Sequence, residues 1–282
     1  MSGSPSIGAV GRGTIWAMIN SIAGQGLSLL VFLITARFVS KEAFGIMAVS
    51  LLVVEAFKQI VIASFGTALT AQRNPTDKDY NACFLTILFC GFVSAGLLFV
   101  LADPVAALLG HEEIGDTLRL ICLILLTAGL SQTHEVWLTK HIQFKTLALR
   151  SIVSLLAGGA VGIYMAVKGY GLQALIMQQI VAAFTAMLIL WTATHWRPGL
   201  STGRENVFAL LKYSKFLFLS RATSFAGTQS DVFFSSYYLG AAATGTYNAA
   251  KRIILALSST LSTALNSVAL PTFAALGQTD GR

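Results

Sequence analysis

The stretch ACFLTILFCGFVSAGLLFVLA, residues 82–102, contains no charged side chain. It is long enough to cross the hydrocarbon of a bilayer as one helix, which takes about 20 apolar residues. Its apolar residues are continuous, whereas the strands of a membrane barrel alternate apolar and polar positions. The whole chain shares this character, with 55% hydrophobic and 11% charged residues over 282 positions. We therefore expect an all-α polytopic membrane protein.

Apolar runs of similar length recur on both sides of this stretch. We predict eight transmembrane helices, at residues 14–37, 43–66, 82–102, 117–138, 147–167, 170–192, 213–239 and 246–275. A helix in lipid must satisfy its own backbone hydrogen bonds, so we expect Pro75, Pro104 and Pro198 in the connections. Pro271, near the end of the last run, is the exception.

Basic residues give the chain a formal net charge of +7. A nucleic-acid-binding protein gathers its Lys and Arg on one solvated face or tail. Here they are dispersed between the apolar runs, so we expect no nucleic-acid partner. Membrane proteins keep an excess of basic loop residues in the cytoplasm. This bias predicts a cytoplasmic N-terminus, with these basic residues on the same side: Arg12, Arg73, Lys78, Lys140, Lys145, Arg150, Arg197, Arg204, Lys212 and Lys215.

The chain also resembles itself at an offset of 200 residues. The matched positions are Trp16 with Phe216, Phe38-Val39 with Tyr238-Leu239, Ala43 with Ala243, and Gly45 with Gly245. Transporters are often built from two related halves. We therefore predict a six-helix N-terminal lobe over residues 1–200 and the first two helices of a related C-terminal lobe over 201–282. An even number of helices per unit relates the halves by an axis along the membrane normal, and we expect the second lobe to be incomplete.

Short motifs in the connections carry a family resemblance. In chain order they are Ala36-Arg37-Phe38-Val39 with Phe44-Gly45, Leu138-Thr139-Lys140 with Phe144-Lys145, Gly169-Tyr170-Gly171, Trp196-Arg197-Pro198, Tyr238-Leu239-Gly240 with Gly245 and Tyr247, and Leu270-Pro271-Thr272-Phe273. In their order and spacing the chain resembles the polysaccharide transport family. These are the Wzx-like flippases of O-antigen and exopolysaccharide units, within the multidrug/oligosaccharidyl-lipid/polysaccharide flippase superfamily. Two features depart from the family: Gln173 stands where Trp is frequent, and the chain has fewer than the family's dozen or more helices.

The resemblance implies a carrier in the bacterial inner membrane. It would move an undecaprenyl-pyrophosphate-linked oligosaccharide repeat unit from the cytoplasmic to the periplasmic leaflet by alternating access, for exopolysaccharide or lipopolysaccharide assembly. Its partners would be that lipid-linked oligosaccharide, membrane lipid, and a polysaccharide polymerase with its export machinery. We expect no catalytic residue, no cofactor and no metal site.

Charged residues inside the apolar runs are the candidate contacts to such a substrate, because a pyrophosphate needs cations along a path through the membrane. Glu55 and Lys58 lie at i and i+3 on one helix face and can pair. Arg221 is the leading candidate, since a guanidinium stays charged and can hold phosphate through two parallel hydrogen bonds. We expect Lys58 and Arg221 to flank one anionic headgroup. The alternatives are a structural ion pair for Lys58 and snorkelling of Arg221 toward the cytoplasmic surface.

A second group lies nearer the other membrane face. Lys251 and Arg252 are candidate pyrophosphate contacts or, alternatively, interfacial anchors. Asp231 could bind a coupling cation or pair with Lys251 or Arg252, and Glu55 could carry a coupling proton. Polar side chains that we expect to line the path, unless they only join helices, are Asn20, Gln25, Gln178 and Gln229.

Two other functions fit a chain of this hydrophobicity. A cation-coupled multidrug exporter could share the fold, but it would replace the cationic lining by an apolar aromatic pocket. A membrane saccharide polymerase or glycosyltransferase would need carboxylates or bases gathered in a sizeable loop. The connections between the runs are short and contain no compact acidic pair. We therefore expect a transporter and not an enzyme.

Overall fold

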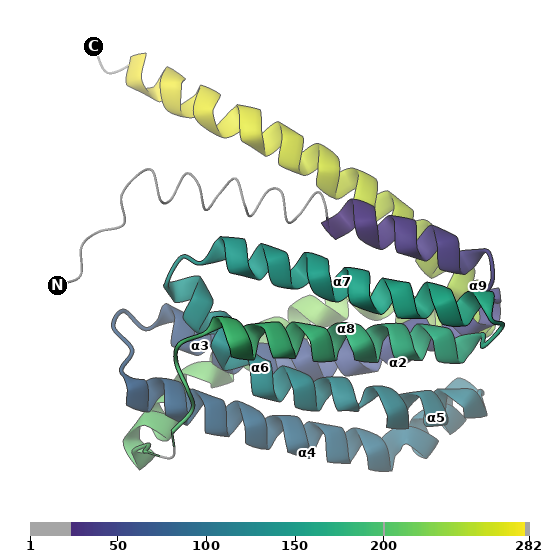
Figure 1. The fold of residues 1–282 in the computed structure, drawn as a ribbon, viewed down its shortest axis with the longest axis horizontal. Coiled ribbons are helices and arrows are strands. Elements are labelled where there is room, and N and C mark those ends of the chain that lie inside the picture. The colour runs from purple at the N-terminus through teal and green to yellow at the C-terminus, as the bar shows by residue number, and fades with distance from the viewer. Residues whose placement is uncertain (1–23, 200, 280–282) are drawn as a thin grey trace.

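The computed structural model describes residues 24–199 and 201–279, with the side chains of residues 204, 256, 257 and 259–279 left out of the description. Its helices are Gly24–Ala36, α2 (Lys41–Ala56), the π-helix η1 (Phe57–Ile62), α3 (Ala63–Ala71), α4 (Asp77–Leu109), α5 (Glu112–Ile121), α6 (Leu123–Lys140), α7 (Phe144–Val167), α8 (Leu172–Ala193) and α9 (Arg204–Thr279). No strand occurs within the described ranges, which confirms the predicted all-α fold class (Figure 1).

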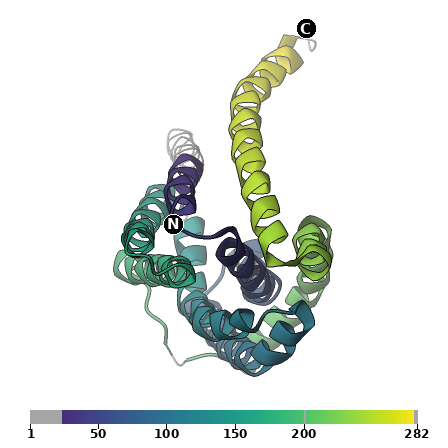
Figure 2. The same ribbon diagram turned by 90° about the vertical axis from the view of Figure 1, so that its right-hand side faces the viewer.

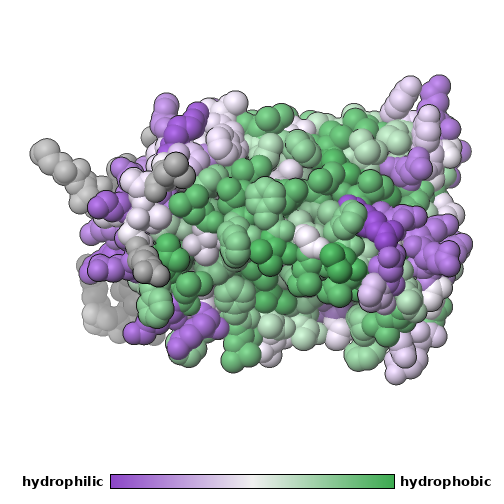
Figure 3. Space-filling model, turned by 90° about the horizontal axis from the view of Figure 1, so that it is seen from below, coloured by the Kyte–Doolittle hydropathy of each residue, from purple (hydrophilic) through white to green (hydrophobic). Residues whose placement is uncertain are grey.

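Five helical segments are long and apolar enough to cross a membrane: Lys41–Ala71, Asp77–Leu109, Glu112–Lys140, Phe144–Val167 and Leu172–Ala193. They coincide within a few residues with the five runs predicted between residues 43 and 192. The face of the molecule in Figure 3 is apolar across its middle and hydrophilic at both ends. This is the surface that a bundle surrounded by lipid requires, and the chain is a multi-pass membrane protein.

The other three predicted helices are not among these five spans. The run 14–37 lies partly outside the described residues, which begin at Gly24. The runs 213–239 and 246–275 both fall in α9, whose helical course is broken at Gly240 with φ 79° and ψ 176°. Neither segment of α9 is among the five apolar spans. The number of eight transmembrane helices therefore stays a prediction.

One expectation about the connections is wrong. Pro104 lies inside α4, which continues to Leu109. Proline removes one backbone hydrogen bond, and membrane helices tolerate this where neighbouring helices satisfy the freed carbonyl.

Glu112 and Glu113 lie in the first turn of α5. Their negative charges stabilise the positive end of the helix dipole there. Cys122 then joins α5 to α6, with its backbone in the right-handed helical region.

Local sequence signals explain where two helices begin and end. The Ser40 hydroxyl accepts a hydrogen bond from the Ala43 amide and caps α2. At the start of α4, the carboxylate of Asp79 accepts a hydrogen bond of 2.8 Å from the backbone amide of Thr76, as part of a capping box. α4 ends at Gly110, whose φ of 73° is readily adopted only without a Cβ atom.

The connection from α8 to α9 is held against α4, and this fixes where α9 begins. The Gly199 amide donates to Oδ1 of Asn81 at 2.9 Å, and Nδ2 of Asn81 donates to the Ser201 carbonyl at 3.1 Å. In the first turn of α9, Nδ2 of Asn206 donates to Oδ1 of Asp79 at 2.7 Å. The first segment of α9 therefore starts from a defined point on the bundle.

The two segments of α9 separate at Gly240, and the second segment crosses α2 at very short range. A Cβ atom added to Gly45 would collide with the carbonyl of Ala241, and one added to Gly245 would collide with the carbonyl of Lys41. Only glycine permits such an approach of two backbones. Beyond the crossing, the second segment extends away from the other helices (Figure 2). The crossing lies at the end of the bundle that carries the turns after Ala36, Leu109 and Val167, on the right in Figure 1, and we call it the Gly240 end.

Candidate anion-binding site

Lys58 and Glu55 form the ion pair that their spacing predicts. Nζ of Lys58 lies 2.8 Å from Oε1 of Glu55, and their side chains are 39% and 35% exposed. Nε2 of Gln59 donates to the other carboxylate oxygen of Glu55 at 3.4 Å. Lys58 and Gln59 belong to η1, and π-helical turns inside longer helices are frequent at functional sites.

Lys251 and Asp231 form a second ion pair, which fastens the two segments of α9 to each other. Nζ of Lys251 lies 2.9 Å and 2.8 Å from the two carboxylate oxygens of Asp231. The hydroxyl of Tyr247 donates to the same carboxylate at 2.5 Å, and Oε1 of Gln229 accepts from Lys251 at 3.3 Å. Of the alternatives left open for Asp231, the structure shows the pair with Lys251.

Arg221 has no carboxylate partner among the described residues. Its Nη2 donates to Oγ1 of Thr67 on α3 at 2.7 Å. Around it is an open groove of about 470 Å³ between η1, α3 and the first segment of α9. We call this the Arg221 groove, and it is lined by Gln59, Thr67, Leu217, Ser220, Arg221, Ser224, Phe225 and Thr228. The six α9 residues are spaced three or four apart or adjacent, so they share one face of the helix.

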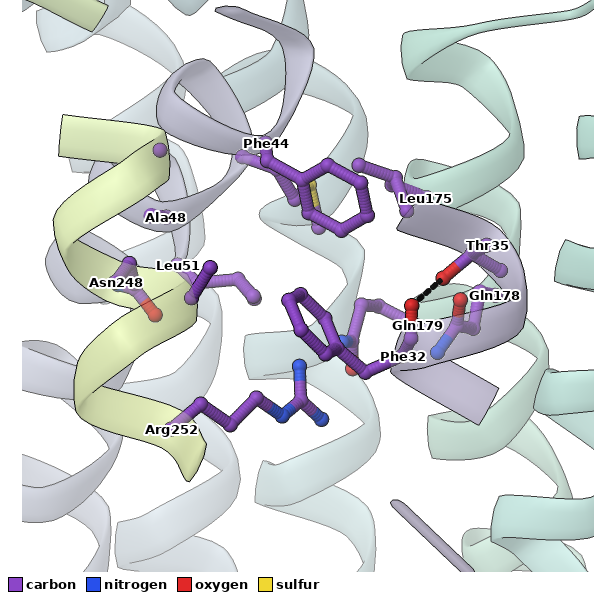
Figure 4. Close-up of a pocket in the computed structure, with 13 residues that line it drawn as sticks. Phe32, Thr35, Phe44, Ala48, Leu51, Leu175, Gln178, Gln179, Asn248 and Arg252 are labelled. Carbon is purple, nitrogen blue, oxygen red and sulfur yellow. Dashed lines mark hydrogen bonds between the residues drawn. The ribbon is translucent and has the colours of Figure 1, made fainter. Parts of the chain in front are cut away.

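Arg252 also has no carboxylate partner within the described part of the chain. Its Nη2 donates to Oγ of Ser28 at 2.6 Å, and its guanidinium carbon lies 5.0 Å from the ring centroid of Phe32. It faces a small cavity of about 60 Å³, the Arg252 pocket, where the first described helix, α2, α8 and α9 meet (Figure 4). The pocket is lined by Phe32, Thr35, Phe44, Met47, Ala48, Leu51, Leu175, Gln178, Gln179, Gly245, Asn248, Ala249 and Arg252.

The absence of a carboxylate beside Arg221 and Arg252 takes in nearly every acid of the chain. Of its twelve acidic residues, only Asp280 lies outside the described residues. Ion pairs neutralise Lys58 and Lys251, whereas the guanidinium groups of Arg221 and Arg252 meet hydroxyl groups and, for Arg252, an aromatic face. An uncompensated cation inside a membrane protein is costly. Both arginines can therefore bind an anion with no ion pair to break first.

Three of the predicted site residues line the two cavities, namely Arg221, Gln178 and Arg252. Arg221 lines the groove and Gln59 lies across from it, but its neighbour Lys58 is not among the lining residues. Gln178 lines the Arg252 pocket, Gln229 contacts Lys251, and Gln25 is exposed on the first described helix. Asn20 lies outside the described residues.

The sequence did not indicate several polar residues that contact the arginines or line the Arg252 pocket. They are Ser28, Thr67, Gln179 and Asn248. Asn248 precedes Arg252 by one helical turn, and this spacing is the one signal that could have indicated it. The others come from different helices, so nothing local in the sequence pairs them with an arginine.

His134 belongs to the packing of the bundle. It is fully buried, with Nδ1 2.8 Å from Oγ1 of Thr194, and its ring contacts Trp191 and Trp196. No group of three or more His, Cys, Asp or Glu residues that could hold a metal ion occurs in the described residues.

A family model described as polysaccharide biosynthesis protein matches residues 34–282. Among curated proteins, the succinoglycan biosynthesis transport protein ExoT of Rhizobium meliloti (strain 1021) is 29% identical over 273 residues, which are 96% of this chain and 55% of that protein. The teichuronic acid biosynthesis protein TuaB of Bacillus subtilis (strain 168) is 24% identical over 225 residues, 77% of this chain and 46% of that protein.

The amylovoran biosynthesis protein AmsL of Erwinia amylovora is 23% identical over 206 residues, which cover 72% of this chain and 53% of that protein. The chain thus spans about half the length of these relatives. No solved structure matches it.

Proposed function

The chain belongs to the polysaccharide biosynthesis protein family, and from this membership we propose that it acts as a flippase for an anionic, lipid-linked saccharide. It is a multi-pass membrane protein with a role in polysaccharide biosynthesis and transport. The proposed cargo is an undecaprenyl-pyrophosphate-linked oligosaccharide, moved from the cytoplasmic to the periplasmic leaflet of the bacterial inner membrane. The N-terminus and the connection at residues 194–203 are then cytoplasmic, and the Gly240 end is periplasmic.

One observation carries this proposal: Arg221 lies in a groove lined mostly by hydroxyl and amide side chains, and no carboxylate of the described residues neutralises it. Pyrophosphate is excluded from hydrocarbon by its charge, so a carrier must offer fixed cations and polar groups. A guanidinium presents two parallel N–H groups to phosphate oxygens. The hydroxyls of Ser220, Ser224 and Thr228 supply further hydrogen bonds along the same face of α9.

Arg221 and Arg252 lie at different distances from the bend at Gly240, which suits an elongated substrate. Counted along the two segments of α9 from that bend, Arg252 is about 18 Å away and Arg221 about 28 Å away, at 1.5 Å per residue. With the headgroup at Arg221, a part of the same molecule about 10 Å further along lies at the level of Arg252. Alternating access, in which two lobes rock about the site, would expose the Arg221 groove to one face and then to the other.

The test uses the complete gene product in cells whose own gene is deleted. Arg221→Gln keeps a polar side chain but shortens it and removes its charge, so we expect the lipid-linked precursor to accumulate in the inner leaflet and polymer export to fall at least about tenfold. The matched control is Arg37→Gln, because Arg37 is an exposed arginine at the Gly240 end. Normal export by Arg221→Gln at normal protein level would refute the proposed site.

A further inference from the structure

The Arg252 pocket differs from the Arg221 groove in size and in its neutral polar residues. The groove is open and has a volume of about 470 Å³, whereas the pocket has about 60 Å³. A cavity of this size admits a few water molecules or one small group. It therefore cannot enclose a saccharide, but it can receive a substituent that projects from one.

The charge of the pocket is that of one cation. Arg252 is the single charged residue among its lining residues, and no described carboxylate pairs with it. The Phe32 ring at 5.0 Å accounts for one face of the guanidinium by a cation–π contact, and one Nη2 hydrogen bond goes to Ser28. The remaining N–H groups lie in the plane of the guanidinium, where a flat two-oxygen anion can accept two of them at once.

The neutral polar residues of the pocket are amides. Gln178 and Gln179 come from α8 and Asn248 from α9, and Figure 4 shows them around the space that Arg252 faces. Oε1 of Gln178 itself is buried close to Gly162 of α7. Side-chain amides both donate and accept hydrogen bonds, so they suit a ligand that carries hydroxyl groups beside its negative charge.

Building on the proposed function, we infer that the Arg252 pocket binds a carboxylate carried by a sugar residue of the lipid-linked repeat unit. A sugar acid offers one negative charge on a flat group, and hydroxyl groups next to it. Pyrophosphate offers at least two negative charges and no hydroxyl donor, and it suits the larger Arg221 groove. The two sites lie about 10 Å apart in depth, and the pyrophosphate and the first sugars are consecutive parts of one molecule. The pocket thus selects acidic over neutral repeat units.

The test compares two substrates that differ at one residue. The complete gene product is reconstituted in phosphatidylcholine liposomes, which offer no carboxylate, with undecaprenyl-pyrophosphate-linked disaccharides whose second sugar is either glucuronate or glucose. We measure the rate at which each disaccharide reaches the opposite leaflet. Arg252→Gln should slow the glucuronate substrate about tenfold and leave the glucose substrate within about twofold of wild type. Arg252→Lys should be intermediate, because an ammonium cannot form two parallel hydrogen bonds.

The controls separate this inference from the proposed function. Arg221→Gln should slow both substrates equally, because both carry pyrophosphate. If wild-type protein moves neither substrate, the flippase proposal fails and the inference falls with it. If wild type moves both and Arg252→Gln slows both equally or neither, the carboxylate site is overturned and the flippase stands. If Arg252→Gln does not fold, Asn248→Leu, which keeps the charge, should slow only the glucuronate substrate; an equal loss for both substrates overturns the inference.

Discussion

Lys58 and Lys251 each contact a carboxylate at 2.8 Å, whereas Arg221 and Arg252 contact hydroxyl groups. A lysine ammonium is a compact point charge, and a carboxylate beside it removes most of its cost inside a membrane protein. A guanidinium cannot lose its proton and keeps several donors free after one hydrogen bond. The lysine pairs therefore stabilise the helices, and the arginines are the residues available to an anion.

Removal of one partner from the Lys251–Asp231 pair should destabilise the protein. Asp231→Asn leaves the Lys251 charge uncompensated. Breaking a fully buried pair costs about 3–5 kcal/mol, but the Asp231 side chain is 37% exposed, so we expect about 1–2 kcal/mol. The measurement is thermal unfolding of the purified protein in detergent. The double variant Asp231→Asn with Lys251→Met should regain most of the loss, and a single variant as stable as wild type would show that the pair contributes nothing.

The Thr67 hydroxyl should matter because it holds Arg221 in the groove. Thr67→Val keeps the shape of the side chain but removes the acceptor, and a hydrogen bond to a charged group contributes about 1.5–3 kcal/mol. We expect a lower unfolding midpoint and slower transport. Thr223→Val is the matched control, since the hydroxyl of Thr223 bonds only to its own helix at Leu219. Equal effects of the two substitutions would remove any special role of Thr67.

Sequence spacing predicted the contact between Glu55 and Lys58, because both lie on one face of one helix. It left the partner of Asp231 open, because Lys251 follows a change of chain direction at Gly240. It could not find Thr67, which meets Arg221 only through the relative rotation of α3 and α9. That rotation is set by packing across the whole bundle, and the local pattern does not record it.

At the scale of helices, the crossing of α2 and α9 depends on glycine. Gly45→Ala places a methyl group against the backbone of Ala241, which cannot rotate aside as a side chain can. We expect the two helices to separate, with a loss of about 1–3 kcal/mol in unfolding free energy and slower transport. The matched control is Gly96→Ala in α4, where an added Cβ meets nothing within 4 Å.

The control should be neutral or slightly stabilising, by up to about 1 kcal/mol, because alanine is the better helix former. Both variants are compared by thermal unfolding in detergent. If Gly45→Ala were as stable as Gly96→Ala, the close approach of the two backbones would be contradicted.

Apolar runs were enough to predict which segments form helices. They were not enough to predict irregularities within those helices. Continuous runs located the five spans between residues 41 and 193 to within a few residues. The π-helical turn Phe57–Ile62 and the passage of α4 through Pro104 were not indicated, because the apolar pattern is the same on both sides of each. Neighbouring helices determine whether such irregularities are tolerated, and a sequence read one helix at a time contains no information about neighbours.

Over the whole molecule, the crossing of α2 and α9 is reciprocal. Gly45 meets Ala241 and Gly245 meets Lys41, and these four residues are two pairs at the 200-residue offset found in the sequence. Two halves related by a two-fold axis would make a contact of this kind. The division into lobes at residues 1–200 and 201–282 stays a prediction. Sequence comparison shows the family, and because the chain spans about half the length of its relatives, substrate and transport cycle are proposals.

The proposed transport activity and the proposed site at Arg221 both require that the protein binds a charged lipid headgroup. The direct measurement is the affinity of the complete gene product for undecaprenyl pyrophosphate linked to a saccharide, against uncharged undecaprenol, in detergent by native mass spectrometry. We expect wild type to bind the pyrophosphate form at least about tenfold more tightly, and Arg221→Gln to lose most of that preference. Equal affinity of wild type for both lipids, or an unchanged preference in Arg221→Gln, would contradict a cationic site for the headgroup.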